Sequence, residues 1–434
     1  MRLLAVLFSF LPAVILAQST QPDRLLSALK GRALADHASR LGTDERVSFY
    51  ETLIRYKPDD LHYKNLLATA FIQKMRETTD YGYLDRAAAI LESVLSSDAN
   101  DYEALRLREE IELERHQFAQ AAEDSQRMAK IAPEDPWNWG ALGDALMELG
   151  QYEKAAGAYQ KMVSIRPDLS SYNRAAYYRF IAGDAAGAID VMKRAIAAGA
   201  PSGENTAWCL VDLGNLYFKT GRLEEAAQAY AAALRVFPGY HPAFGALGRV
   251  QAAQGKNKDA IKSYKRAQAA APFVDYTSAL QDLYEEAGLK EEAARQVALI
   301  EVVDKLGVAA REKTNRNMAL IYADHDRKIA RALELAESEF AIRKDVYTSD
   351  VLAWALYKNR RYSEAANAMA GALKMGTPEP GFYYHAGMIA YALGNKEEAR
   401  KQLGRALSLN PKFDFRQAVI AEETLKETLK EVRQ

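Results

Sequence analysis

Hydrophobic and polar positions follow one another along this chain at the spacing of helices. In the clearest unit, Leu210, Leu213 and Tyr217 share one helical face, Gly221 interrupts the pattern, and a second amphipathic run ends at Pro238. Residues three and four apart lie on the same side of a helix, and glycine and proline commonly end such a run. The pattern therefore predicts two helices joined by a tight turn.

The same unit returns about every 34 residues. Two pairs of prolines, Pro133 with Pro167 and Pro238 with Pro272, keep this interval. A fixed period of this size over most of a chain indicates a linear array of repeats instead of separate globular domains. One alanine in the second helix of each unit gives the phase: Ala87, Ala121, Ala155, Ala188, Ala226, Ala260, Ala293, Ala332, Ala365 and Ala399.

Within a unit, the sizes of the side chains fit close helix packing. Gly214 and Ala226 are small enough to let the two helices approach, and Tyr217 and Tyr230 are large enough to fill the space around them. This pattern resembles the tetratricopeptide repeat, over roughly 61–411. The resemblance implies an all-α fold, a right-handed α-solenoid of antiparallel helix pairs.

Some units depart from the pattern. Arg360 stands where the turn glycine belongs, and the first full unit carries an insertion near 76–83 between its two helices. Neighbouring repeats hold each other in place, so weak units are expected inside a strong array.

The array also predicts how the chain is divided. Lengthened spacings separate three blocks of repeats, and the two ends read as caps that cover the last apolar faces. In the C-terminal helix we expect Ile420, Leu425 and Leu429 to face inward. The predicted divisions are a signal peptide at 1–17, an N-terminal helical cap or partial repeat at 18–59, repeat blocks at 60–200, 201–306 and 307–411, and a C-terminal capping helix at 412–434.

Residues 1–17 have the pattern of an export signal. Arg2 supplies an early positive charge, an apolar run follows, and the small Ala17 precedes the polar Gln18. The apolar run is shorter than the roughly 20 residues that a membrane-spanning helix needs. We expect a cleaved signal and a periplasmic or secreted protein, with a retained anchor as the alternative. A single cysteine, Cys209, agrees with an oxidising compartment.

The remaining composition narrows the chemistry. The 57 Lys+Arg and 58 Asp+Glu residues give a net charge of -1, which argues against nucleic-acid binding. The six histidines never fall at ligand spacing with one another, so no metal or other cofactor is expected. His325, in a repeat turn, is expected to be exposed or to cap a helix. No nucleophile can be paired with a base, and the sequence predicts no enzymatic activity.

Large side chains that the repeat core does not need are the candidates for binding. In the family that the chain resembles, the first helices of the repeats line a concave groove that receives peptides. Carried over by position, the resemblance implies a partner-binding groove formed by Asn173, Tyr177, Phe180, Trp208, Asn215, Lys219 and Arg249. Further candidates for the same face are Asp275, Asp282, Trp354 and Tyr384.

The predicted function is an exported scaffold or adaptor that binds a protein or peptide in this groove. No nucleic acid is expected among its partners, and no stable membrane span after signal cleavage. The alternative is a protein that uses the groove for a small molecule or a polysaccharide, or for an enzymatic reaction. A buried cluster of titratable side chains would favour that alternative, whereas exposed coplanar aromatic rings would favour sugar binding.

Overall fold

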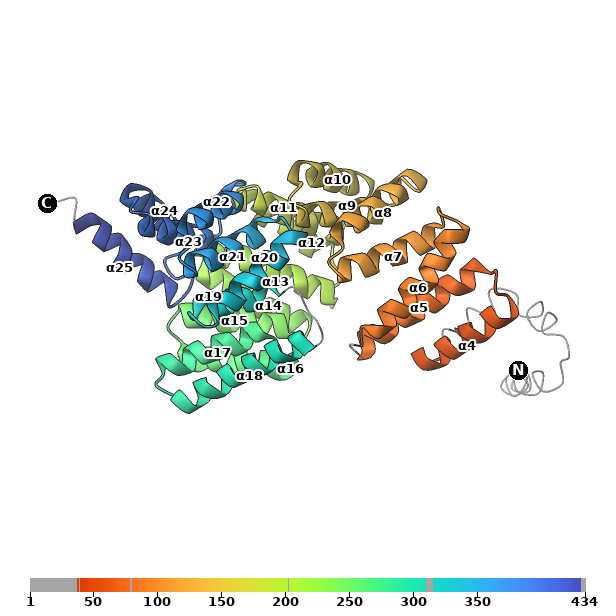
Figure 1. Ribbon diagram of the computed structural model, residues 1–434, viewed down its shortest axis with the longest axis horizontal. Coiled ribbons are helices and arrows are strands. Elements are labelled where there is room, and N and C mark those ends of the chain that lie inside the picture. Colours follow the sequence, from red (N-terminus) through yellow and green to blue (C-terminus); the bar gives the residue numbers. More distant parts are fainter. Residues whose placement is uncertain (1–36, 39, 79, 202, 310–314, 431–434) are drawn as a thin grey trace. The chain divides into compact units, whose positions relative to one another are not determined.

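The computed structural model describes residues 37–38, 40–78, 80–201, 203–309 and 315–430. Over these residues the chain forms 22 helices and no strand (Figure 1). The predicted all-α solenoid is therefore confirmed, whereas the predicted signal at 1–17 lies outside the described residues. No helix in the described part of the chain combines the length and the apolar character that crossing a membrane requires.

The chain divides into two compact units, 1–133 and 134–434. The core of the first unit includes Leu84, Leu91 and Val94, which lie on one face of a single helix and are fully or almost fully buried. The described helices of this unit are α4 (Thr43–Tyr56), α5 (Leu61–Thr78), α6 (Gly82–Ser97), α7 (Tyr102–Glu114) and α8 (Phe118–Ile131).

The second unit continues the array from α9 to α25. In each pair an inner helix, with an odd number up to α23, is followed by an outer helix with an even number. The inner helices are α9 (Pro136–Glu148), α11 (Leu169–Ile181), α13 (Glu204–Lys219), α15 (His241–Ala253), α17 (Val274–Glu286), α19 (Arg316–Asp324), α21 (Val346–Lys358) and α23 (Pro380–Ala392). The outer helices are α10 (Tyr152–Ile165), α12 (Ala185–Ala198), α14 (Leu223–Val236), α16 (Asn257–Ala270), α18 (Lys290–Ala309), α20 (Ile329–Ile342), α22 (Tyr362–Leu373) and α24 (Lys396–Leu409), and α25 (Gln417–Lys430) follows.

Each pair is held together by the small and large residues that the sequence pattern singled out. A Cβ placed on Gly214 would overlap the ring of Tyr230, and a Cβ on Gly143 would overlap the ring of Tyr159. The two helices of a pair therefore approach more closely than any residue with a side chain would allow. Ala226, at the phase position of the same unit, is fully buried.

The turn between inner and outer helices requires a left-handed backbone at one position. Gly221 has φ +75° there, and Arg360 has φ +60° at the corresponding position of a later repeat. Arginine thus takes the conformation that glycine adopts more easily, which explains how the unit keeps its shape without the turn glycine.

Two other local expectations are changed by the structure. The insertion near 76–83 is not an extra loop, because it lengthens α5 to 18 residues. The lengthened spacing at the 306/307 boundary likewise extends α18 to 20 residues. The predicted block boundaries at 200/201 and 306/307 both fall within the second unit.

The expected inward face of the C-terminal helix was wrong for two of its three residues, whereas Leu425 is half-buried. Ile420 is 41% exposed and Leu429 is 51% exposed. The residues that face the array are Ala418, Ala421 and, further along, Thr424 and Thr428. Small side chains are buried here because α25 packs closely against α24 and α23, so the bulkier Ile420 and Leu429 are left exposed.

Candidate functional site

The last three connections of the second unit pack against its first three turns. Here a turn links an inner helix to its own outer helix, and a loop links an outer helix to the next inner helix. The partners are between 192 and 196 residues apart, and the array therefore returns onto itself after about six repeats. The hydrogen bonds that join them run from Lys344 N to Glu148 O (2.7 Å), from Thr377 Oγ1 to Ile181 O (2.6 Å), and from Asn410 Nδ2 to Phe218 O (2.7 Å).

A turn glycine makes each of these approaches possible. A Cβ on Gly150 would lie 2.5 Å from the carbonyl oxygen of Lys344, and one on Gly221 would lie 2.8 Å from that of Leu409. At Gly183 the corresponding distance, to the carbonyl of the later loop, is 3.2 Å. We call this row of three turn–loop contacts the seam.

Charged groups reinforce the seam. Lys219 Nζ lies 2.7 Å from Glu379 Oε2 and donates to the hydroxyl of Tyr347 at 2.9 Å. Arg343 and Glu148 form a second ion pair, at 3.1 Å. Burial raises the pKa of Glu148 to about 7, against the opposing effect of Arg343. Two turns of the superhelix are therefore linked by partly buried charges as well as by backbone contacts.

Three of the predicted groove residues lie beside this seam. Phe180 is buried, and Lys219 Nζ lies 4.9 Å from the centroid of its ring. Tyr177 is 41% exposed, yet burial raises the pKa of its hydroxyl well above the usual range. Both observations fit a ring whose exposed face lies next to Tyr347, in the space between two turns of the superhelix. In this region the groove is thus lined by the protein's own later repeats.

The other predicted groove residues form two clusters. Asn173 donates to Asp212 at 3.2 Å, and the nearby Trp208 is 56% exposed. Arg249 donates to Asn215 at 2.6 Å, which joins neighbouring repeats directly. The predicted residues therefore share the inner face, but as three local clusters and not as one open surface. Their role in binding a partner stays a prediction.

Arg249 is unusual within these clusters. Its guanidinium also donates to the hydroxyl of Tyr230 at 3.3 Å and lies over the ring of Phe218, 4.5 Å from its centroid. Its Nε is buried without a hydrogen-bond partner, and no carboxylate of the described residues lies within ion-pair distance. Because truncating this side chain would remove packing as well as charge, Arg249 combines a structural role with an inner-face position.

A pocket of about 420 Å³ continues from Arg249 along the inner face. Asp275, Asp282, Trp354 and Tyr384, which the sequence pattern turned inward, all line it. The loop before α25 closes one side. Other lining residues were not predicted, namely Asp324, Lys412, Phe413, Asp414, Arg416 and Gln417.

The pocket holds a cluster of titratable side chains. Asp324 Oδ1 accepts hydrogen bonds from the indole of Trp354 and the amide of Gln417, both at 2.8 Å. Burial raises the pKa of Asp324 to about 6. Asp282 is paired with Arg416 and His325. The pocket is therefore polar and mixed in charge, with an aromatic wall.

Of the two expectations for His325, exposure was wrong, whereas capping is confirmed because His325 is the C-cap residue of α19. Its side chain is only 6% exposed, with Nε2 2.8 Å from Asp282 Oδ1 and Nδ1 2.8 Å from the carbonyl of Ile321. Both neighbours are acceptors, so this geometry suits an imidazolium that donates from both nitrogens. Burial is the largest single effect and lowers the pKa of His325, but the hydrogen bond to Asp282, its negative charge and the hydrogen bond to Ile321 together outweigh burial, so the pKa is raised.

The single cysteine, Cys209, is buried. Burial raises the pKa of the Cys209 thiol to about 12. At neutral pH the side chain is thus a neutral thiol. Among the described residues, no group of three or more His, Cys, Asp or Glu side chains has the arrangement of a metal site.

Comparisons with solved structures return several chains at low identity. MamA residues 41 to the end from Desulfovibrio magneticus RS-1 is 22% identical, with 39% of this chain and 94% of that chain covered and a TM-score of 0.33. PilW, a type IV pilus biogenesis factor, is 17% identical over 46% and 92% of the two chains, with a TM-score of 0.41. The Cut9–Hcn1 hetero-tetramer of APC/C is 14% identical over 90% and 68%, with a TM-score of 0.46. A comparison with curated proteins finds no match.

The family models decide the classification. Three models described as tetratricopeptide repeat match the chain, one at 211–275 and 351–412, one at 167–239 and one at 112–176. Together they cover more than half of the 434 residues. The chain belongs to the tetratricopeptide repeat family.

Proposed function

We propose that this protein is an exported adaptor that binds an extended segment of a partner protein in the inner-face pocket of its second unit. Tetratricopeptide repeats make the chain a protein-interaction scaffold in general terms. The finer proposal adds two points, the compartment and the site. The export pattern of residues 1–17 supports the compartment.

The observation that carries the proposal is the pocket itself. Its volume of about 420 Å³ is enough for a few side chains but not for a folded domain, so a peptide segment or an exposed loop is the fitting ligand. Phe413 is half-buried and offers aromatic surface in front of the buried rings of Trp354 and Tyr384. Arg249 and Lys412 add positive charge beside several aspartates. Such a lining suits a segment with both acidic and polar side chains.

The test compares two charge reversals near the C-terminal end of the chain. Lys412 is exposed and lines the pocket, whereas Lys426 is exposed on α25 and does not line it. We expect crosslinking and pull-down from the native compartment to recover a partner with the parent protein and with Lys426→Glu, but much less with Lys412→Glu. Equal recovery with both variants would contradict the proposed site.

The proposed compartment has a separate test. We expect the protein to be found in the periplasmic or extracellular fraction and its N-terminal sequence to begin near Gln18. Exported material that still begins at Met1 would replace the cleaved signal by a retained anchor. Protein confined to the cytoplasmic fraction would contradict export altogether.

A second candidate function is favoured by the titratable cluster. Asp324, with its pKa near 6, and the Asp282–His325 pair could hold a small polar molecule in the same pocket. Native mass spectrometry of protein purified from its own compartment tests this. A bound small-molecule mass that is lost in Asp324→Asn supports the candidate, and protein without any added mass that still captures a protein partner rejects it.

A further inference from the structure

The array changes its packing after α18. Outer helices such as α14 and α16 pack on the inner helix that follows them, whereas α18 packs mainly on α17. The direct link to α19 is a hydrogen bond from the hydroxyl of Tyr322 to Asp304, at 2.8 Å. The C-terminal half of α18 carries an apolar face that the described residues leave exposed.

That face forms one stripe. Leu299 is 37% exposed, Val302 is 49% exposed and Leu306 is 64% exposed. Their spacing of three and four residues places them on one side of the helix. Only Ala293 and Ile300 of α18 are buried, so this stripe is not the edge of a packed core.

The neighbouring outer helix, α16, carries a basic stripe. Lys258, Lys262, Lys265 and Arg266 are exposed and line a shallow depression along the helix. The only acidic residue of α16 is Asp259, in a protein whose net charge is -1. Within the described part of the chain, none of these four cations lies within 4 Å of a carboxylate. The positive charge of α16 is therefore not neutralised by the protein itself.

The two stripes belong to one surface. Gln268 Nε2, on the last turn of α16, donates to Gln296 Oε1 of α18 at 2.9 Å. The two helices run parallel, because each is antiparallel to α17 between them in sequence (Figure 1). The lysines precede this contact along α16, and the apolar residues follow it along α18. At 1.5 Å per residue, the basic and apolar halves together extend over about 30 Å.

From this juxtaposition we infer that the α16–α18 surface docks a helical segment of another protein, about five turns long, with an acidic half and an apolar half. The acidic half would neutralise Lys258, Lys262 and Lys265, and the apolar half would cover the stripe on α18. An exposed apolar patch beside uncompensated charge is the usual composition of such an interface. A nucleic acid would leave the apolar half uncovered. This surface is formed by outer helices, so the inference does not depend on the inner-face pocket.

The experiment uses two fluorescein-labelled synthetic helices of 20 residues with identical leucine-rich halves. The polar half carries glutamates in one peptide and lysines in the other. Binding to the full-length protein is measured by fluorescence anisotropy. We expect the glutamate peptide to bind at least 10-fold more tightly than the lysine peptide, with an affinity that falls as salt is added.

Three double variants locate the binding. Lys262→Glu with Lys265→Glu, and Leu299→Ser with Leu306→Ser, should each weaken binding of the glutamate peptide at least 10-fold. Lys193→Glu with Arg194→Glu, two exposed charges on α12, is the matched control and should leave it unchanged. Circular dichroism checks that the variants stay folded.

Several results would overturn the inference. These are equal affinity for the two peptides, no binding of the glutamate peptide, or binding that the α16 and α18 variants do not change. Two further outcomes assign the surface to another occupant. Binding to phosphatidylglycerol vesicles but not to the glutamate peptide would show a membrane-facing surface, and self-association of the parent that the serine variants abolish would show an interface between two copies.

Discussion

The seam makes a sharp prediction about turn glycines that look equivalent in sequence. Gly150 and Gly255 occupy the same position of their repeats and have φ values of +67° and +73°. A Cβ on Gly150 would lie 2.5 Å from the carbonyl oxygen of Lys344, whereas nothing lies within 4 Å of a Cβ on Gly255. Replacing each by alanine therefore separates the cost of the backbone conformation from the cost of opening the seam.

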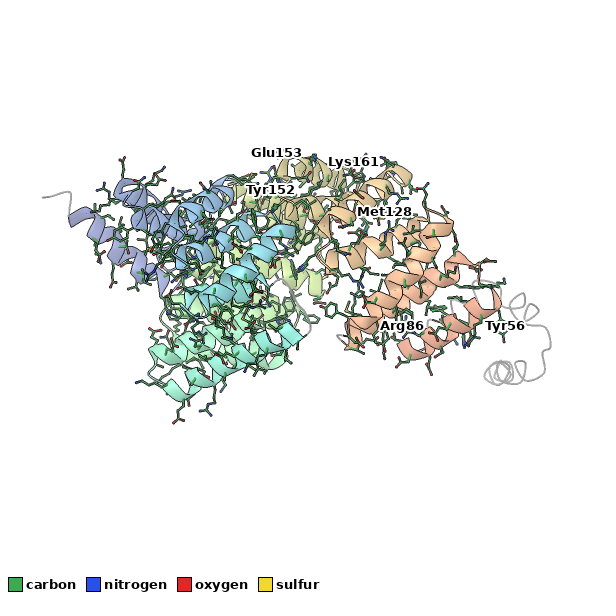
Figure 2. All side chains as sticks on the ribbon, viewed as in Figure 1. Tyr56, Arg86, Met128, Tyr152, Glu153 and Lys161 are labelled. Atoms are coloured by element: carbon green, nitrogen blue, oxygen red, sulfur yellow. The ribbon has the colours of Figure 1, made fainter. Side chains whose placement is uncertain are left out.

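The magnitudes follow from the structure. Both variants place alanine in a left-handed conformation, at a cost of about 1–2 kcal/mol. Only Gly150→Ala must also push the later loop away. This strains the hydrogen bond from Lys344 N to Glu148 O and the buried bond from Val346 N to the hydroxyl of Tyr152 (labelled in Figure 2), at 2.7 and 2.8 Å. Each lost hydrogen bond costs about 0.5–1.5 kcal/mol, and more where a buried group is left unpaired. We therefore expect an excess of about 2–4 kcal/mol for Gly150→Ala.

The assay combines urea unfolding with hydrogen exchange. Long repeat arrays can unfold in more than one step, so the exchange of the Val346 amide reports on the seam directly. We expect this amide to exchange much faster in Gly150→Ala than in Gly255→Ala. Alanine at Gly221 and Gly183, where the distances are 2.8 and 3.2 Å, should have progressively smaller effects. Equal losses of stability and equal exchange in the Gly150 and Gly255 variants would refute the seam.

Three further predictions concern the pocket, the inner face and the end of the array. Burial raises the pKa of Asp324 to about 6, so the folded state favours its neutral form, and this stabilisation is lost as the pH rises through 6. The raised pKa of His325 likewise favours its charged form, and that contribution is lost above the unfolded value of about 6.5. The urea midpoint should therefore fall from pH 5 to 8, less steeply in Asp324→Asn, and a flat profile would contradict both assignments. Trp208→Ala should leave the melting temperature nearly unchanged while weakening partner binding by about 1–2 kcal/mol. Trp354→Ala, at a side chain only 2% exposed, should instead cost about 3–5 kcal/mol of stability. A large stability loss in Trp208→Ala would place that ring in the core. Deleting α25 should lower solubility, measured by size-exclusion chromatography, because α24 and α23 lose their cover, and a truncated protein as soluble as the parent would refute the capping role.

Much of the fold could be predicted from the sequence because each repeat depends on residues close to it. Gly214 and Tyr230 are 16 residues apart, and the same short-range pairing recurs at Gly143 and Tyr159. Such contacts leave a periodic pattern that a single sequence can display. The same register predicts that four residues face inward, and all four line the pocket, namely Asp275, Asp282, Trp354 and Tyr384.

The seam could not be predicted in this way. It joins residues between 192 and 196 positions apart, so it depends on the small rotation between neighbouring repeats summed over about six of them. Nothing in the sequence around Lys219 shows that Glu379 will lie 2.7 Å away. The burial of His325 has the same origin, since its partner Asp282 and the neighbouring Arg416 come from different parts of the array. The exposure of Ile420, which lines the pocket, reflects packing of α25 against α23 and α24 that the helical spacing alone did not reveal.

The central claim, that the inner-face pocket receives the partner, is tested most directly by photocrosslinking in living cells. Ile420 lines the pocket, whereas its neighbour Val419 is exposed on the same helix and does not line it. A benzoylphenylalanine in place of each residue probes positions one residue apart in the same protein. We predict that Ile420→benzoylphenylalanine gives a specific protein adduct, identified by mass spectrometry, and that Val419→benzoylphenylalanine does not. An adduct of the same protein from both positions, or none from Ile420 while the partner is still captured, would contradict the claim.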